Sequence, residues 1–190
     1  MVPGTVPNPA SPEFDLPFTA VVIPVREADA LVRRRAFQVH PQLLPVDGSA
    51  TAHVTLLAPF YPPSRIDDAV VHHLTRFCAD VSPFTFELAE VCQFPQGATY
   101  LAPEPAGIFR LLVAELHKEF PEFPPYGGAF DDIVPHLTVP LPDGEDTEAL
   151  RTALYRTLPL RLHAVEATLV HVEEQNTHVI ATLPFGSTAA

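Results

Sequence analysis

Two short apolar runs that carry the same pair of polar residues constrain the fold of this chain most strongly. The first run, TAHVTLLAPF, contains His53 and Thr55, and the second, PHLTVP, contains His136 and Thr138. Side chains alternate between the two faces of a β-strand, so a histidine and a threonine two residues apart share one face. Two such strands that face each other would place two acid/base groups beside two hydroxyl donors.

The rest of the chain mixes strand patterns with helix patterns. Alternating or β-branched apolar residues indicate strands, and apolar residues at helical spacing indicate helices. Ser64 is expected to cap the second helix, with Asp67 in its first turn. We expect strands at 18–25, 51–60, 84–92, 98–101 and 135–140, helices at 27–39, 64–79, 105–120 and 146–158, and a terminal hairpin of 161–172 and 177–183. This order favours an α+β fold with a largely antiparallel sheet.

Length and composition favour a single domain. The chain has 190 residues, and a hydrophobic content of 47% is enough for a sizeable core. Residues 1–17 hold five prolines and no helical or strand pattern, so we expect a flexible Pro-rich tail before a domain at 18–186. Residues 187–190 are expected to be frayed.

We expect a cytoplasmic protein without a membrane partner. The first 17 residues contain no basic residue and no apolar run, which argues against a signal peptide. No stretch approaches the roughly 20 apolar residues of a membrane span. Cys78 and Cys92 lack CxxC spacing and are interpreted as buried free thiols of a reducing compartment.

The charge balance limits the partners. The net charge is −12, and Lys118 is the single lysine. Non-specific binding of a long duplex requires many basic contacts to phosphates, so long duplex nucleic acid is excluded as the main partner. The cluster Arg33, Arg34 and Arg35 is interpreted as a solvated helix face, with a phosphate-facing patch as the alternative. A small phosphorylated ligand held by a few donors in a cleft remains compatible with the charge.

Paired histidines and threonines suit phosphodiester chemistry. The ordinary imidazole pKa of about 6.5 lets one histidine take a proton from a nucleophile while another protonates the leaving group. His53 and His136 would divide this work, and the hydroxyls of Thr55 and Thr138 would donate to the non-bridging phosphate oxygens. The alternative is that both pairs are ordinary strand residues.

The remaining histidines are assigned no catalytic role. His72 and His73 are adjacent on a predicted helix and cannot share a face. His171 and His178 fall on the predicted terminal hairpin, where surface or packed positions are expected and one of them could line the cleft. A zinc site built from the motif histidines and a third histidine lacks supporting HxH, HExxH or CxxC spacing. We therefore expect no metal and no cofactor.

The two motifs resemble the pair of H-x-[ST] signatures of the 2H phosphoesterase superfamily, which includes RNA 2′,3′-cyclic phosphodiesterases and 2′-5′ RNA ligase-like proteins. The surroundings are similar too: Pro59 and Phe60 follow the first motif, and the loop YGGAF precedes the second. The resemblance covers about residues 18–185. It implies a bilobal α+β fold in which two largely antiparallel sheets, flanked by helices, enclose a central cleft with both motifs.

The same resemblance implies metal-independent hydrolysis of 2′,3′-cyclic phosphates on nucleotides or RNA ends. By position, Phe60, Tyr61 and Tyr126 are added as base-stacking or cleft-lining residues. We expect His136 to activate water and His53 to protonate the departing ribose oxygen, with a monomer acting on a small nucleotide or RNA end. The alternatives are a non-catalytic nucleotide or RNA-end binding module, a 2′-5′ RNA ligase, and an esterase acting on a non-nucleotide phosphodiester.

Overall fold

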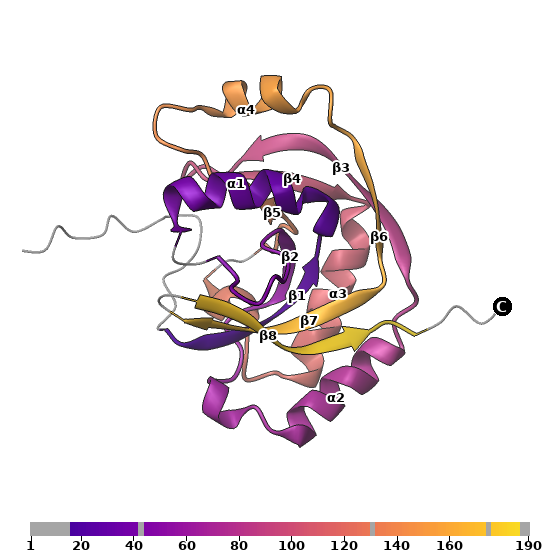
Figure 1. Cartoon of the computed structure of the whole chain (residues 1–190). Coiled ribbons are helices and arrows are strands. Elements are labelled where there is room, and N and C mark those ends of the chain that lie inside the picture. Colours follow the sequence, from indigo (N-terminus) through magenta and orange to yellow (C-terminus); the bar gives the residue numbers. More distant parts are fainter. Residues whose placement is uncertain (1–15, 42–43, 130–131, 174–175, 187–190) are drawn as a thin grey trace, which may run out of the picture.

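A computed structural model describes residues 16–41, 44–129, 132–173 and 176–186 of the chain (Figure 1). In this part, eight strands form one antiparallel sheet in the order β6-β3-β4-β5-β2-β1-β7-β8. The strands are β1 (Phe18–Pro24), β2 (His53–Leu57), β3 (Phe84–Gln93), β4 (Thr99–Glu104), β5 (Leu137–Thr138), β6 (Leu160–Ala164), β7 (Glu166–Glu173) and β8 (Asn176–Pro184). The predicted α+β class with antiparallel pairing is confirmed.

Four α-helices of the described residues accompany the sheet. They are α1 (Asp29–Val39), α2 (Asp68–Ala79), α3 (Ala106–Glu119) and α4 (Thr147–Leu154), and short 3₁₀ turns occur at η1 (Arg26–Ala28), η3 (Pro63–Arg65) and η4 (Pro125–Gly128). Helix α3 packs on β2 and β4, α2 on β8, and α4 on β3. Figure 1 shows α4 beyond β3 at one end of the molecule and α2 at the other. No helix within the described ranges is long and apolar enough to cross a membrane.

The structure differs from the prediction of two separate sheets. The two-residue strand β5 pairs with β4 through Tyr100 and Thr138, and with β2 through Val54 and Leu137. It therefore joins a β6-β3-β4 half to a β2-β1-β7-β8 half, and each half contributes one partner to the strand that carries the second motif.

Two boundaries also differ from the sequence-based expectation. Ser64 falls in η3, and Asp67 caps α2 because its carboxylate accepts the Val70 amide at 3.0 Å. Ile66 is extended, so the helix begins only after it. The stretch 161–172 is two strands, β6 on β3 and β7 between β1 and β8, so the terminal hairpin is β7–β8. The predicted tail at 1–17, except residues 16 and 17, and the frayed end at 187–190 lie outside the described residues.

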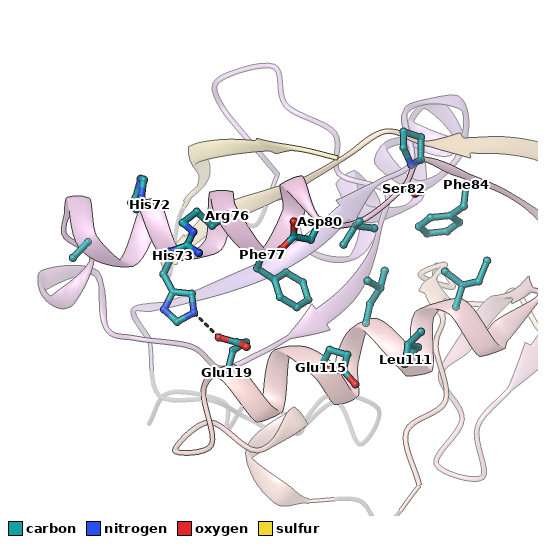
Figure 2. A pocket seen from close by; sticks show the side chains of 15 residues that line it. His72, His73, Arg76, Phe77, Asp80, Ser82, Phe84, Leu111, Glu115 and Glu119 are labelled. Carbon is teal, nitrogen blue, oxygen red and sulfur yellow. Dashed lines mark hydrogen bonds and ion pairs between the residues drawn. The ribbon is translucent and has the colours of Figure 1, made fainter. Parts of the chain in front are cut away.

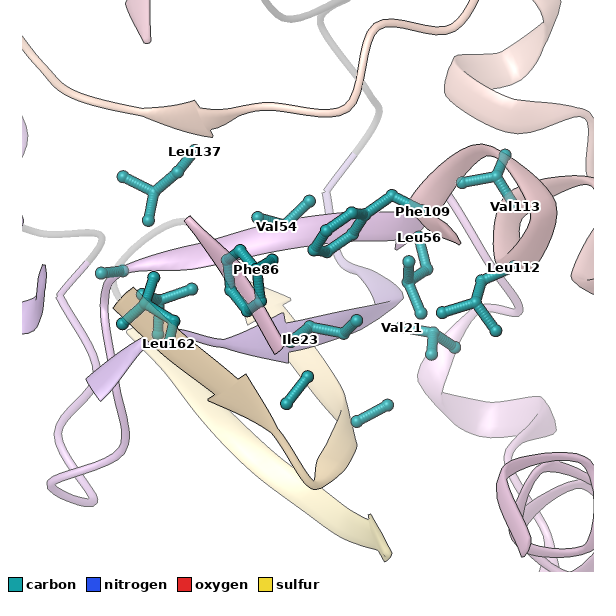
Figure 3. Close-up of a cluster of buried hydrophobic side chains, with 14 of the residues drawn as sticks. Val21, Ile23, Val54, Leu56, Phe86, Phe109, Leu112, Val113, Leu137 and Leu162 are labelled. Carbon is teal, nitrogen blue, oxygen red and sulfur yellow. The ribbon is translucent and has the colours of Figure 1, made fainter. Parts of the chain in front are cut away.

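The hydrophobic core explains why the motif strands present their polar residues on one face. Val54 and Leu137, which separate histidine from threonine in each motif, are fully buried. Figure 3 shows them in one apolar cluster with Phe109 and Leu112 of α3. Because side chains alternate along a strand, burying Val54 and Leu137 under α3 turns both histidines to the opposite face of the sheet. Both cysteines are free thiols, as predicted; Cys78 is buried, whereas Cys92, also expected to be buried, is only half-buried.

Candidate active site

The pairing of β2 with β5 brings the four predicted motif residues together. Val54 lies opposite Leu137 in antiparallel register. One step along each strand places His53 opposite Thr138 and Thr55 opposite His136, all on the face away from the core. The two histidines are diagonal neighbours in this arrangement, a relationship that separates residues by about 7–8 Å. That spacing leaves room for one phosphoryl group between the imidazoles.

Both histidines are held by the same local hydrogen bond. His53 Nδ1 lies 2.8 Å from the carbonyl oxygen of Thr51, and His136 Nδ1 lies 2.7 Å from that of Val134. A carbonyl oxygen only accepts, so Nδ1 carries the proton and donates in each ring. The neutral tautomer therefore leaves Nε2 unprotonated in both histidines, ready to take a proton from a substrate or water.

The surroundings shift both imidazoles towards the neutral form. Desolvation lowers the pKa of His53, and the hydrogen bond to Thr51 partly offsets this. Desolvation also lowers the pKa of His136, and a positive charge on His53 lowers it further. His53 is nonetheless accessible to solvent. Protein atoms therefore surround His53 closely enough to desolvate it, while one side of the imidazole stays open to solvent. The electrostatic effect of His53 on His136 agrees with the closeness of the two rings that the strand register gives.

Aromatic residues enclose His136. Tyr126, from η4, stacks on the imidazole at 6.0 Å between ring centroids and forms a hydrogen bond with Thr55. Burial raises the pKa of Tyr126 to about 12. Its backbone has φ +53°, a left-handed conformation that costs a residue with a side chain about 1–2 kcal/mol. Strain of this kind persists where the surrounding structure holds a residue in place, as it does at many functional sites.

Two further aromatic residues at His136 were missed by the sequence analysis. Phe94 contacts the His136 ring edge-on at 5.0 Å, Tyr100 at 5.7 Å, and the two aromatic rings stack on each other at 4.2 Å. Tyr100 lies opposite Thr138 in the β4–β5 pair, so it shares the face of the motif residues. The only sequence signal was the strand predicted at 98–101, which contains Tyr100, and the partner of that strand could not be inferred.

The segment before the first motif is held by a carboxylate that the sequence analysis did not single out. Asp29, the first residue of α1, accepts hydrogen bonds from the backbone amides of Thr51 and Ala52. Its other oxygen accepts from Arg33 at 3.1 Å. Because Thr51 supplies the carbonyl that orients His53, Asp29 fixes the position of the group that holds the catalytic candidate.

Comparison with known proteins agrees with this arrangement. A sequence model of the 2′-5′ RNA ligase superfamily matches residues 24–176, which include both motifs. The chain belongs to the 2′-5′ RNA ligase superfamily. No curated protein matches the chain.

Solved structures of this superfamily's fold resemble the chain over most of its length. TT0787 of Thermus thermophilus has a TM-score of 0.57 at 18% identity and covers 90% of this chain and 100% of its own. E. coli LigT in complex with 3′-AMP has a TM-score of 0.53 at 15% identity and covers 89% and 98%. LigT with phosphate has a TM-score of 0.52 at 16% identity and covers 90% and 98%. At these identities the likeness establishes the 2H phosphoesterase fold, which the motifs predicted.

Phe60 and Tyr61, two of the predicted substrate-binding residues, lie apart from the motif residues. Phe60 is buried and packs edge-on against Phe120 and Phe123 at 5.0 Å. Tyr61 packs against the same phenylalanines, and its hydroxyl donates to Glu122 at 2.6 Å. The structure therefore groups them with the core near the end of α3 and does not bring them to the histidines, whereas it does bring Tyr126 there.

A separate groove of about 920 Å³ lies between α2 and α3 (Figure 2). Its walls are apolar around Phe77, Phe84 and Leu111, and His73 bonds to Glu119 across one end at 2.6 Å. None of the four motif residues lines it. The groove therefore lacks the predicted catalytic residues, which lie on the β2–β5 pair.

Proposed function

We propose that this chain is a metal-independent phosphodiesterase that opens 2′,3′-cyclic phosphates of nucleotides or RNA ends. Membership of the superfamily supports a 2H phosphoesterase-type activity. The observation that carries the finer proposal is the Val54–Leu137 register, which implies a crossed arrangement with His53 opposite Thr138 and Thr55 opposite His136. Each histidine then has a hydroxyl donor beside it and the other histidine across the gap.

The crossed arrangement accounts for each step of hydrolysis. His136 Nε2 takes a proton from water, whose oxygen attacks phosphorus and forms a new P–O bond. The P–O bond to one ribose oxygen breaks, and protonated His53 gives its Nε2 proton to that oxygen. The hydroxyls of Thr55 and Thr138 donate to the non-bridging oxygens, where negative charge increases in the transition state. The product is a nucleoside monophosphate with one free ribose hydroxyl.

Electrostatic repulsion between the two imidazoles favours a pair in which one histidine is charged and the other is neutral. A proton on His53 lowers the pKa of His136, so the state with His53 charged and His136 neutral is favoured over the doubly charged state. That state holds one acid and one base, as the reaction requires. In ligation a 5′-hydroxyl takes the place of water as the nucleophile, and the base and the acid keep the same roles, so a 2′-5′ ligase activity uses the same site.

A small substrate is favoured over a polynucleotide. Several arginines are already paired with carboxylates: Arg26 with Glu166, Arg35 with Glu145, and Arg161 with Glu87. Paired guanidinium groups and a net charge of −12 leave little to neutralise a phosphate backbone. The aromatic residues at His136 offer stacking surfaces for one base. E. coli LigT, which shares the fold, has been crystallised with 3′-AMP and with phosphate.

Hydrolysis of the four nucleoside 2′,3′-cyclic monophosphates tests this function. The products are separated by chromatography, which also shows whether the 2′- or the 3′-oxygen leaves. The proposal is supported if turnover is lost in His53→Ala and in His136→Ala and is insensitive to EDTA. Turnover should be kept in His163→Ala, which changes an exposed residue of β6. Binding of 3′-AMP without turnover of any cyclic phosphate would instead indicate the binding module. Joining of RNA ends without hydrolysis would indicate a ligase.

A further inference from the structure

Three potential metal ligands gather on the terminal hairpin, outside the candidate active site. His171 and Glu173 are two residues apart on β7, and His178 lies directly opposite His171 on β8. The three side chains therefore share one face of the hairpin. One ligand atom from each lies within 4.8 Å of the others, and all three residues are half-buried. We propose that this cluster is a Zn²⁺ site that fastens the end of the β7–β8 hairpin.

The distances within the cluster match those of a metal site better than those of hydrogen bonds. His171 Nδ1 lies 3.3 Å from His178 Nε2 and 3.3 Å from a carboxylate oxygen of Glu173. Good hydrogen bonds to nitrogen or oxygen span about 2.7–3.2 Å. Two ligand atoms of a tetrahedral Zn²⁺, each about 2.0–2.1 Å from the ion, stand about 3.3–3.4 Å apart. Two of the three separations already have this value.

The donor set also fits Zn²⁺. Two imidazoles and one carboxylate are a common three-residue zinc set, with the fourth position left for another ligand or water. Glu173 is the more exposed of the two ligands on β7, so its carboxylate can rotate to close the remaining separation to His178. Without a cation, the single Nδ1 proton of His171 can satisfy only one of its two neighbours at a time.

Asn176 provides a second, independent observation. It lies opposite Glu173 and two residues before His178, so it belongs to the same face of the hairpin. Its carbonyl oxygen Oδ1 is buried and has no hydrogen-bond partner among the described residues. An unsatisfied buried carbonyl is costly, and here it would be satisfied by a water bound to the metal or by the metal itself. His171 Nε2 is likewise buried without such a partner, and it carries the ring proton once Nδ1 is the ligand atom.

The site is separate from the proposed catalytic residues because the two lie on opposite faces of the sheet. Thr55 pairs with Val22, and Val22 pairs with Thr168 of β7. Position 171 is an odd number of residues from Thr168, so His171 faces the other way. The Zn²⁺ would hold the two strands together at the closed end of the hairpin, beside the Glu173–Asn176 pair, and take no part in phosphodiester cleavage.

Direct metal binding tests this site. The full-length chain is treated with EDTA, desalted and titrated with ZnCl₂ by calorimetry, and Co²⁺ is added separately as a spectroscopic probe. We expect one Zn²⁺ per chain, the visible absorption bands of tetrahedral Co²⁺, and a melting temperature that rises with Zn²⁺ concentration. His178→Ala and Glu173→Gln should weaken Zn²⁺ binding at least about 100-fold. His163→Ala, which changes an exposed histidine on β6, should bind as the parent chain does.

Two outcomes of the titrations would count against the site. Absence of a Zn²⁺-binding transition in the parent chain would overturn it, and so would equal Zn²⁺ affinity in the parent and in both ligand variants. Circular dichroism verifies that the variants fold. If His178→Ala does not fold, Glu173→Gln, which keeps the side-chain shape, provides the test. Because the site faces away from the histidine pair, cyclic phosphate hydrolysis should be unchanged by EDTA in the parent chain. A parent chain that binds Zn²⁺ but hydrolyses no cyclic phosphate would reject the proposed function and leave this site intact.

Discussion

Val54 of β2 lies opposite Leu137 of β5, and this one cross-strand pair determines the geometry of the candidate active site. Both side chains are fully buried, so a slip of one residue would expose them and bury the histidines. Core packing therefore stabilises the register that places His53 beside Thr138 and Thr55 beside His136. The catalytic arrangement is a consequence of the hydrophobic residues between the polar ones.

Removing either motif histidine should abolish most of the cyclic phosphodiesterase activity. His53→Ala and His136→Ala should each lower kcat by about 10²–10⁴-fold, because each removes one proton transfer. The double variant should lose little more than the worse single variant, since the two groups act as a unit. Steady-state hydrolysis of 2′,3′-cyclic nucleotides measures this, with His163→Ala as the control. If the two losses multiply in the double variant, the histidines do not act in one step.

The two threonines should affect the transition state more than substrate binding. Thr55→Val and Thr138→Val keep the side-chain shape and remove a donor to the non-bridging oxygens, which should lower kcat by about 10²-fold or more. KM should change far less. Thr85→Val, at an exposed position on β3, is the matched control. Equal rates for the control and both site variants would show that the hydroxyls do not contact the phosphate.

The pH optimum should lie on the acidic side of the ordinary imidazole pKa. Burial lowers the pKa of both His53 and His136. Activity falls at low pH when the base is protonated, and at high pH when the acid loses its proton, so lowering both pKa values moves both limbs of the kcat/KM profile to lower pH. The bound phosphate stabilises imidazolium and so raises the pKa values of the histidines in the complex. The pH profile of kcat should therefore lie at higher pH than that of kcat/KM. A kcat/KM optimum above pH 7 would contradict this assignment.

Local patterns along the chain predicted much of the fold and part of the site. Alternation identified the two motif strands, and the identical position of His53 and His136 in their apolar frames indicated a shared role. The α+β class followed from the mixture of strands and helices. Each of these inferences depends on residues a few positions apart, where side-chain periodicity is a direct physical signal.

What could not be predicted depends on contacts between distant segments. Phe94 and Tyr100 reach His136 only because β5 inserts between β4 and β2, and no local pattern specifies that order. Phe60 was assigned to the site because it follows the first motif, but the core near Phe120 buries it. The stretch 161–172 contains one uninterrupted run of strand residues, and only the pairing partners reveal that it is divided at Val165.

The aromatic residues at His136 should set the affinity for the base. Phe94→Ala removes one ring of the stacked Phe94–Tyr100 pair, and base stacking contributes about 1–3 kcal/mol. We therefore expect KM for 2′,3′-cyclic nucleotides to rise by about 5–150-fold with a smaller change in kcat. Tyr155→Ala, which removes a ring that is 83% exposed at the end of α4, is the control.

A substrate without a base separates stacking from general damage to the site. Ribose 2,3-cyclic phosphate lacks the aromatic ring, so Phe94→Ala should leave its kcat/KM unchanged relative to the parent chain. A parallel loss on both substrates would mean that Phe94 supports the position of His136 and does not bind the base.

Asp29 should act on catalysis through His53 without touching the substrate. Its carboxylate holds the amides of Thr51 and Ala52, and the Thr51 carbonyl accepts from His53 Nδ1. That carbonyl bond raises the pKa of His53, so loosening Thr51 should lower it. In Asp29→Asn we expect a lower kcat and an alkaline limb of the pH profile displaced to lower pH, because His53 is the proposed acid. The change also weakens charge-assisted hydrogen bonds, each of which stabilises the fold by about 1.5–3 kcal/mol.

The pH profile distinguishes this positioning role from a purely structural one. Asp68→Asn changes the equivalent first residue of α2, an exposed position remote from the motif strands, and should leave the profile in place. Thermal unfolding of both variants reports the stability change separately from activity. If Asp29→Asn lowers the melting temperature and kcat but leaves both limbs of the profile at their original pH, the carboxylate stabilises α1 and its neighbouring segment without tuning His53.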